Sequence, residues 1–204
     1  MEVRDPRNGS LQSLRAQDLS ASLEICPEYA EARRQRDGSR AALLFIGRHA
    51  ERFGLADPAG ELAVLRNDGD GLGFQHVRLV QQFRGLPVLY AELIVHFDRD
   101  FRLYLLTGHY LPTPAMLDIT PALTEASALT AAASAVPGAA PGCGGCSARL
   151  AVYPEEGHAR LVFQVKVNPG MLNAATVLVD AATGKILKTL SDIQTGPGTR
   201  ATPE

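Results

Sequence analysis

The spacing of apolar positions changes along the chain and predicts a helix followed by several strands. Over residues 40 to about 53, apolar residues recur three and four positions apart, which predicts an amphipathic helix capped by Ser39. From Glu61 onward the period becomes two. Hairpin spacing predicts an antiparallel meander with the helix covering one face. The predicted strands cover residues 62–65, 74–83, 88–97 and 101–107, with turns at 67–71, 84–87 and 98–100.

The second half of the chain repeats this order. An Ala-rich helix is predicted from Thr120 or Thr124 to Ala135, followed by a loop rich in Gly and Pro and by strands at 148–153, 160–167, 176–179 and 185–190. The expected fold class is therefore α+β, with two consecutive small units, each a helix packed on an antiparallel meander sheet. The expected division is a peripheral N-terminal arm over 1–39, a first unit over 40–112, a second unit over 113–190 and a C-terminal tail over 191–204.

Composition and charge narrow the class of protein. The 204 residues are 46% hydrophobic and 21% charged, as in ordinary globular proteins. The net charge of −2 leaves no excess of cations for a phosphate backbone, so we expect no nucleic-acid partner. The longest strongly apolar run, residues 41–47, is too short to cross a bilayer, so we expect no membrane insertion. The N-terminus lacks the apolar core of a secretory signal, which leaves open a cytosolic chain and a mature chain whose signal was removed.

Cys143 and Cys146 form the one reactive spacing, Cys-Gly-Gly-Cys. A thioredoxin-like motif follows a strand and opens a helix, whereas here a Gly/Pro loop precedes the pair and a strand-like segment follows it. A zinc site would need a second ligand pair, which the sequence lacks. We therefore favour a local disulfide or free thiols over a redox or metal function, and we expect Cys26 to pack as a small hydrophobe.

Residues 76–88, His-Val-Arg-Leu-Val-Gln-Gln-Phe-Arg-Gly-Leu-Pro-Val, resemble the core motif of the fungalysin/thermolysin propeptide domain. In that motif a His-x-Arg-x-x-Gln strand turns through an aromatic-x-Gly-aliphatic-Pro-Val sequence. The second half resembles the PepSY domain that normally follows, through its Ala-rich helix, the strand at 161–165 and the sequence Val-Asp-Ala-Ala-Thr-Gly-Lys-Ile at 179–186. The resemblance covers about residues 40–195. It departs from the family at Tyr90, where a small residue is common, and in the loop 136–146, which resembles an insertion.

The resemblance implies the pro-region of a secreted thermolysin-like zinc metalloprotease, acting as an intramolecular folding chaperone and inhibitor. The implied partner is the catalytic domain, in cis or as a non-covalent complex, and the implied location is secreted or periplasmic. The sequence holds no His-Glu-x-x-His, so we expect no catalytic residue and no enzyme activity in this chain. Its five histidines lie on different predicted elements without a carboxylate at ligand spacing, so we expect no metal and no cofactor.

Each residue in the matching motifs has a functional and a structural interpretation. It either contacts the protease or belongs to a solvated strand face or a turn, and for any one residue we favour the structural interpretation. A segment near the C-terminus either enters the substrate cleft near a cleavage point or is a disordered tail. The alternative function is a free-standing secreted or periplasmic protease inhibitor or ligand-binding module of the same fold. The motif positions are His76, Arg78, Gln81, Gln82, Gly85, Pro87, Asp180 and Gly184, and the C-terminal candidates are Ile193, Gln194, Thr195 and Gly196.

Overall fold

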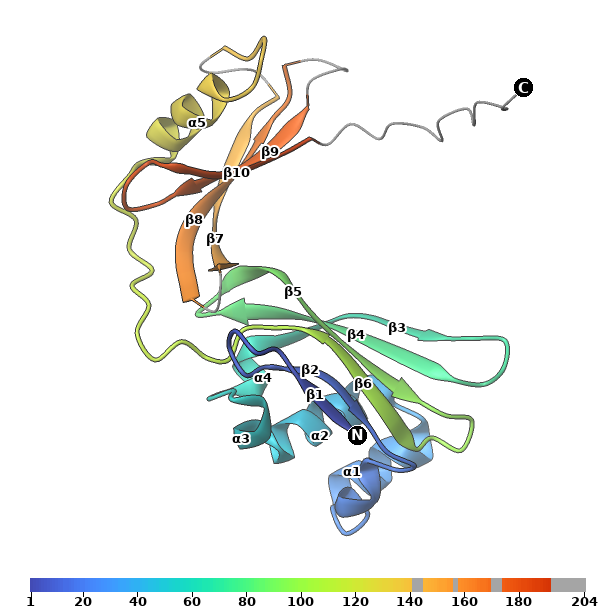
Figure 1. Cartoon of the computed structure of the whole chain (residues 1–204). Helices are drawn as coiled ribbons and strands as arrows, with labels where there is room; N and C mark the ends of the chain where they lie inside the picture. The colour runs from blue at the N-terminus through green and yellow to red at the C-terminus, as the bar shows by residue number, and fades with distance from the viewer. Residues whose placement is uncertain (141–144, 156–157, 170–173, 192–204) are drawn as a thin grey trace, which may run out of the picture. The chain divides into compact units, whose positions relative to one another are not determined.

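The structure is a computed structural model that describes residues 1–140, 145–155, 158–169 and 174–191 (Figure 1). It is a mixed α/β structure, rich in antiparallel strands and with few helices. The chain divides into two compact units. The first comprises Met1–Leu117 and Val152–Arg160, and the second comprises Asp118–Ala151 and the described residues from Leu161 onward. No helix in the described part of the chain is long and apolar enough to cross a membrane.

The first unit is built on an antiparallel sheet whose strands follow the order β1-β2-β6-β5-β4-β3. The four strands from β3 to β6 form the expected meander, in which each strand pairs with the next along the chain. The strands are β1 (Glu2–Arg4), β2 (Leu11–Arg15), β3 (Leu62–Gly69), β4 (Gln75–Phe83), β5 (Leu86–Phe97) and β6 (Leu103–His109).

The N-terminal residues differ from the peripheral arm that the sequence suggests. Strand β2 pairs with β6, and the side chains of Leu11 and Leu14 are 0% and 2% exposed, so this segment extends the sheet and contributes to the core of the first unit. Tyr29, on the following helix, is buried as well. The two apolar residues of β2, Leu11 and Leu14, are three positions apart, so the segment lacks the two-residue alternation that predicts a strand.

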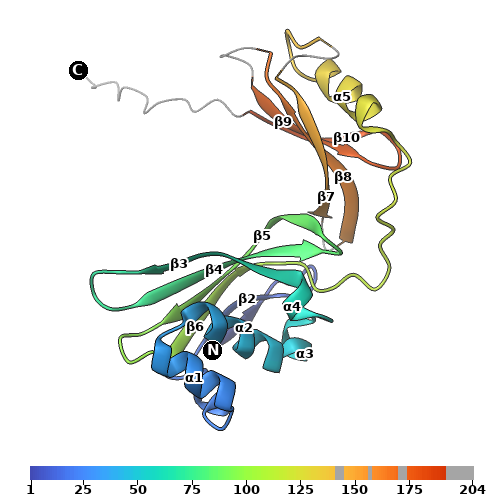
Figure 2. The same ribbon diagram turned by 180° about the vertical axis from the view of Figure 1, so that it is seen from behind.

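The helices of the first unit cover one face of its sheet (Figure 2). The helix expected over 40–53 is divided, because His49 leaves helical geometry with φ −113° and ψ 27°. Its N-cap is Asp37, not Ser39: the Asp37 carboxylate accepts a hydrogen bond from the Arg40 backbone N–H at 3.0 Å. The helices are α1 (Pro27–Gln35), α2 (Gly38–Arg48), α3 (Ala50–Phe53) and α4 (Pro58–Glu61), preceded by a 3₁₀ turn, η1 (Ser20–Leu23).

The first turn of the meander lies later than the sequence suggests. Residues 67–69, expected in a turn, continue β3, where Asp68 pairs with His76 and Gly69 pairs with Gln75. The chain reverses at Asp70, whose carboxylate accepts hydrogen bonds from the Leu72 and Phe74 backbone N–H groups at 2.8 and 2.9 Å. Polar residues in β3 are tolerated because the strand lies at the edge of the sheet and is mostly exposed.

The second unit packs α5 (Glu125–Ser134) on a sheet of four strands in the order β7-β8-β9-β10. The Thr124 hydroxyl caps α5 by accepting from the Ser127 backbone N–H at 3.2 Å. Ala128 and Ala132 on α5 belong to the same buried cluster as the valines of β8 and β9, and every residue of β9 is buried. The strands are β7 (Ser147–Glu155), β8 (His158–Val167), β9 (Ala175–Asp180) and β10 (Ile186–Ser191).

Gly108 in β6 is a position where the sheet requires glycine. Its φ is +147°, and a Cβ added there would lie 2.1 Å from the backbone oxygen of Glu92. We therefore predict that Gly108→Ala lowers the free energy of unfolding by about 3 kcal/mol, because backbone must move to admit the methyl group.

The matched control is Gly47→Ala in α2, where an added Cβ meets no atom within 4 Å. This change is expected to leave the protein as stable or to stabilise it by up to about 1 kcal/mol, through helix propensity. Urea denaturation of both variants provides the measurement. Equal stability of the two variants would contradict the account of the β5–β6 pairing.

Candidate functional site

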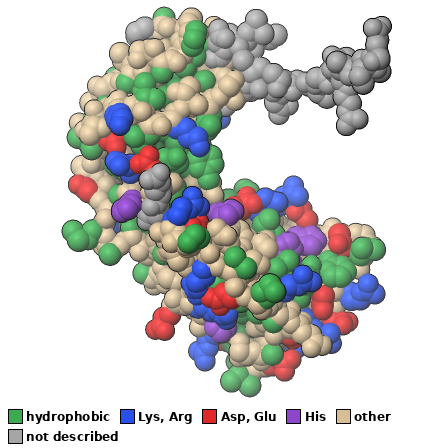
Figure 3. Space-filling view, viewed as in Figure 1, with side chains coloured by type: hydrophobic (Ala, Val, Ile, Leu, Met, Phe, Trp, Pro, Cys, Tyr) green, Lys and Arg blue, Asp and Glu red, His purple; other side chains and the backbone are tan. Residues whose placement is uncertain are grey.

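The face of the first sheet that points away from α2 carries charged and histidine side chains. Strand register places Asp68, His76 and His96 in one row, and Arg66, Arg78 and Ile94 in the next. These six residues line a cavity of about 270 Å³. We call this surface the open face. The space-filling view shows acidic, basic and histidine side chains intermixed over the first unit (Figure 3).

Two histidines of the open face are in direct polar contact. Nδ1 of His76 lies 2.8 Å from Nδ1 of His96, so one ring donates a hydrogen bond to the other. Nε2 of His76 lies 3.6 Å from a carboxylate oxygen of Asp70. Burial and the charge of His76 lower the pKa of His96 to about 4. His96 is therefore a neutral ring at pH 7, with one ring nitrogen that donates a hydrogen bond and one that accepts.

The arginines of the open face are held by neighbouring carboxylates. Arg78 on β4 forms an ion pair with Glu92 on β5, and Arg66 forms one with Asp68 on β3. The Arg78 and Glu92 side chains remain 39% and 34% exposed, so the pair contributes at most about 1 kcal/mol to stability. The ion pairs fix the orientation of these charged side chains within the chain itself. The open face therefore carries a preformed pattern of paired charges.

Nothing in the described residues provides a metal centre, since no group of three or more His, Cys, Asp or Glu side chains there could hold an ion. The chemistry of the open face is that of hydrogen bonds, ion pairs and two imidazole rings.

Gln81 belongs to the opposite, buried face of β4, although the sequence analysis grouped it with Arg78 and Gln82. Its side-chain N–H donates to the Leu111 backbone oxygen at 2.6 Å, and the Leu111 backbone N–H donates to its side-chain oxygen at 2.8 Å. Gln81 is 3% exposed. It therefore ties the segment after β6 to the centre of the sheet. The strict alternation of β4, in which Val77 and Leu79 are also buried, is a signal in the sequence that could have placed it there.

The remaining motif residues of the first unit lie at a chain reversal or near it. Arg84 and Gly85, with φ of +49° and +83°, form the two-residue turn between β4 and β5. Pro87 follows as the second residue of β5. Gln82 lies near the end of β4 and donates from its side chain to the Gly60 backbone oxygen at 3.0 Å. These contacts are structural.

Asp180 and Gly184 lie in the second unit, in the turn from β9 to β10. The Asp180 carboxylate accepts from the Ala182 and Thr183 backbone N–H groups at 3.0 and 2.8 Å, and Gly184 has φ +76°. Cys143 and residues 193–196 lie outside the described residues, so the local disulfide and the inhibitory segment stay predictions. Cys146 is partly buried against the core of the second unit.

The sequence analysis missed His96 and Glu92 as members of the open face. A hairpin closed by Arg84 and Gly85 pairs Phe83 with Leu86, but an irregularity between Val80 and Gln82 shifts the register. Beyond this shift His76 faces His96. Neither the alternation of apolar residues nor the turn residues predict an irregularity inside a strand.

Comparison with known proteins points to propeptides. The sequence profile of the fungalysin/thermolysin propeptide motif matches residues 60–110. Bacillolysin from Bacillus subtilis subsp. amylosacchariticus and bacillolysin from Bacillus subtilis strain 168 are each 27% identical over 185 residues, covering 83% of this chain and 35% of each relative. The chain thus spans about a third of the length of these curated relatives. Among solved structures, the Bacillus megaterium YpeB C-terminal domain matches with a TM-score of 0.39 and 13% identity, covering 93% of this chain and 80% of that one.

Gln81→Leu tests the tie between β4 and Leu111. We predict a loss of about 3 kcal/mol in the free energy of unfolding, because the buried N–H and C=O of Leu111 lose their partners. Gln82→Leu is the control, with an expected loss of about 0.5 kcal/mol, since its hydrogen bond to Gly60 is exposed. Urea denaturation measures both variants, and equal losses would contradict the structural role of Gln81.

His96 makes stability depend on pH. Its pKa is about 4 in the folded protein and about 6.5 in an unfolded chain, so the unfolded state binds a proton more readily between these values. The free energy of unfolding should therefore fall as the pH drops from about 6.5 to about 4. His96→Gln should lose less stability over this range than the parent protein. His158→Gln, at an exposed position of β8, is the control, and a His96→Gln profile parallel to the parent's would contradict the assignment.

Proposed function

We propose that residues 1–204 act as a propeptide region of a secreted thermolysin-like zinc metalloprotease, assisting the folding of the catalytic domain and inhibiting it until removal. The observation that carries this proposal is the propeptide motif over residues 60–110. The similarity to bacillolysin, over 35% of that protein, supports it, because a propeptide occupies only part of a precursor. The propeptide motif is a non-catalytic one, so the peptidase activity would belong to the remainder of the precursor.

The two units would have different roles in this account. The first unit carries the propeptide motif and would present the open face to the catalytic domain. The second, with α5 packed on β8 and β9, would be the PepSY-like unit that its helix and its Asp-x-x-Thr-Gly turn resemble. The segment that contains Ile193 and Gly196 would then lead toward the substrate cleft.

A preformed surface suits both parts of the proposed function. The Arg78–Glu92 pair and the His76–His96 contact hold their side chains in place, so little side-chain freedom is lost when a partner binds. A surface that binds only the native catalytic domain stabilises that state by mass action, which favours folding. The same complex persists after folding and would keep the catalytic domain inhibited. The proposed chaperone role and the proposed inhibitor role would therefore both follow from one interface.

The direct test begins with the gene. We predict that the reading frame continues beyond Glu204 into a sequence with His-Glu-x-x-His, the zinc-binding helix of such proteases. The encoded catalytic domain, denatured and refolded with this chain added in trans, should recover several-fold more peptidase activity than it does alone after the chain is removed. Micromolar chain should inhibit the mature enzyme.

Charge reversal locates the interface. Arg78→Asp should weaken inhibition by about tenfold, since it removes a cation from the open face. Arg34→Asp is the control, because Arg34 lies on α1, away from the open face, and is 76% exposed. A reading frame that stops without a protease sequence would contradict the propeptide proposal and favour a free-standing inhibitor or ligand-binding module. Refolding that is equal with and without the chain would contradict the chaperone role.

A further inference from the structure

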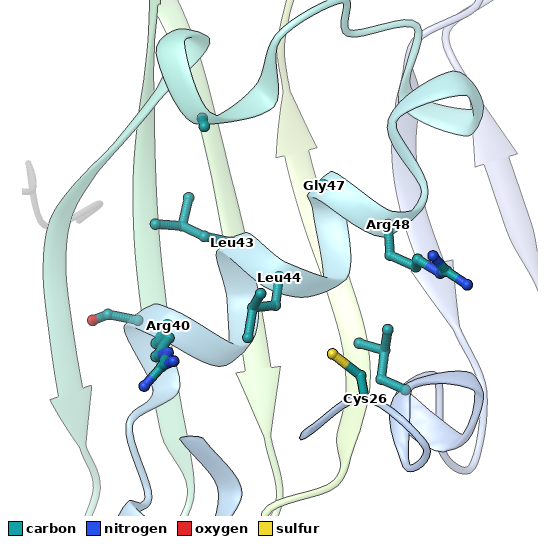
Figure 4. A pocket seen from close by; sticks show the side chains of 9 residues that line it. Cys26, Arg40, Leu43, Leu44, Gly47 and Arg48 are labelled. Carbon is teal, nitrogen blue, oxygen red and sulfur yellow. The ribbon is translucent and has the colours of Figure 1, made fainter. Parts of the chain in front are cut away.

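A groove of about 740 Å³ runs along the outer surface of α2, on the side of the first unit opposite the open face. Leu43 and Leu44 of α2 line it together with Leu23 of η1. Ala59 of α4 and Cys26, the N-cap residue of α1, line it as well. Figure 4 shows Cys26, Leu43, Leu44 and Gly47 around this groove. All these residues belong to the first unit, and none lies within the propeptide motif at 60–110. The propeptide motif therefore does not account for the groove.

Helix α2 carries apolar residues on its outer side as well as on the side that faces the core. Its buried residues Ala41, Ala42, Phe45 and Ile46 face the core. Leu43 and Leu44 are only partly buried. Residues 41–46 are all apolar, on the buried side and the outer side of the helix alike. A helix at a surface normally carries polar residues on its outer side, and one that is apolar all round is normally covered. The outer side of α2 therefore has the character of an interface.

Two cations limit what can cover this side. Arg40 and Arg48 lie on α2 at the two ends of the groove, about 12 Å apart along the helix axis. Both are exposed, and neither forms an ion pair within the described part of the chain. Two acids lie near Arg40. The Asp37 carboxylate accepts from the Arg40 backbone N–H. Glu28 accepts a hydrogen bond from the Cys26 thiol at 3.0 Å, and the positive charge of Arg40 contributes to lowering the pKa of Glu28. A ligand that brings carboxylates to both ends would complement these charges.

Near its Arg48 end, the groove admits a helix backbone. Gly47 is exposed, and a Cβ added there would meet no atom within 4 Å, so the α2 backbone is uncovered at this point. Two helices pack with their axes about 8–10 Å apart, and small residues at the crossing favour the shorter separations. Next to Cys26 in the chain, the Ile25 side chain is 88% exposed and adds apolar surface beside the groove.

We infer that the groove along α2 binds an amphipathic helix of a protein partner, with the helix's apolar face on Leu43, Leu44 and Gly47 and acidic residues at its two ends paired with Arg40 and Arg48. The apolar positions of such a helix recur three and four residues apart, the arrangement used by other helices that bind in grooves. This inference does not depend on the protease proposal, because it uses no residue of the propeptide motif.

The probe is a synthetic helical peptide of about 15 residues, long enough to form a helix on binding. It carries leucines and one tryptophan on its apolar face and glutamates near both ends. The chain contains no tryptophan, so the emission and anisotropy of the indole report on the peptide alone. We expect saturable binding with a blue shift of the emission. A matched peptide with lysines in place of the glutamates should bind about tenfold more weakly.

Variants of the chain locate the binding site. Gly47→Gln places a neutral side chain across the groove and should weaken binding by about tenfold, with an unchanged circular dichroism spectrum. Gly71→Gln is the matched control, since an added Cβ there also meets no atom within 4 Å and the residue lies in the β3–β4 turn. The double variant Arg40→Glu and Arg48→Glu should prefer the lysine peptide over the glutamate peptide.

Several results would overturn the inference. These are failure of the glutamate peptide to bind, equal binding of both peptides to the parent protein, and unchanged binding to Gly47→Gln. A proline-interrupted peptide of the same composition that binds as tightly would show that a helix is not required. Binding of the parent protein, but not of Gly47→Gln, to phosphatidylglycerol vesicles in the absence of peptide binding would assign the groove to a lipid surface instead.

Discussion

The pairing of β4 with β5 is the constraint on which the first unit depends. Its register shift, between Val80 and Gln82, brings His76 opposite His96 and lets Arg78 reach Glu92. The shift lies opposite the part of β5 that includes Tyr90, which has φ +61° and is 57% exposed. A positive φ costs free energy in a residue other than glycine. Tyr90 keeps this conformation because β5 pairs with β4 on both sides of the register shift. The His76–His96 and Arg78–Glu92 contacts of the open face are thus products of one irregularity in the β4–β5 pairing.

The first unit has two chemically different surfaces, one on each side of the paired strands β4 and β5. The strict alternation of β4 sends Val77, Leu79 and Gln81 toward the helices and sends His76 and Arg78 toward solvent. The open face that results is polar and has its charges paired. The outer side of α2 is apolar and carries unpaired cations at its ends within the described part of the chain. Two surfaces of such different chemistry suit two different partners, or two parts of one partner.

Much of the fold could be predicted from the sequence, because clear turn residues bound strands β4 to β6, and an Ala-rich sequence with a capping threonine marks helix α5. The strand predicted over 88–97 appears as Leu86–Phe97. Of the two starts that the sequence left open for the second helix, Thr120 and Thr124, the structure has Thr124 as the N-cap, with the helix beginning at Glu125. What could not be predicted depends on contacts between distant residues. Strand β2 forms because β6 pairs with it. The N-cap of α2 is a local difference, since Asp37 takes the place expected for Ser39 only two residues away. The candidate site was predictable only in part. His76 and Arg78 belong to a motif that the sequence shows. His96 and Glu92 come next to them only through the shifted register of β4 and β5.

The central claim is that the open face is the surface that meets a protease catalytic domain. Its most direct test is a nuclear magnetic resonance titration that follows the imidazole signals of the chain as the catalytic domain encoded with it is added. The account predicts that the signals of His76 and His96 shift together and saturate at one equivalent, while the signal of His158, on β8, does not change. Formation of a complex that leaves the signals of His76 and His96 unchanged would contradict it.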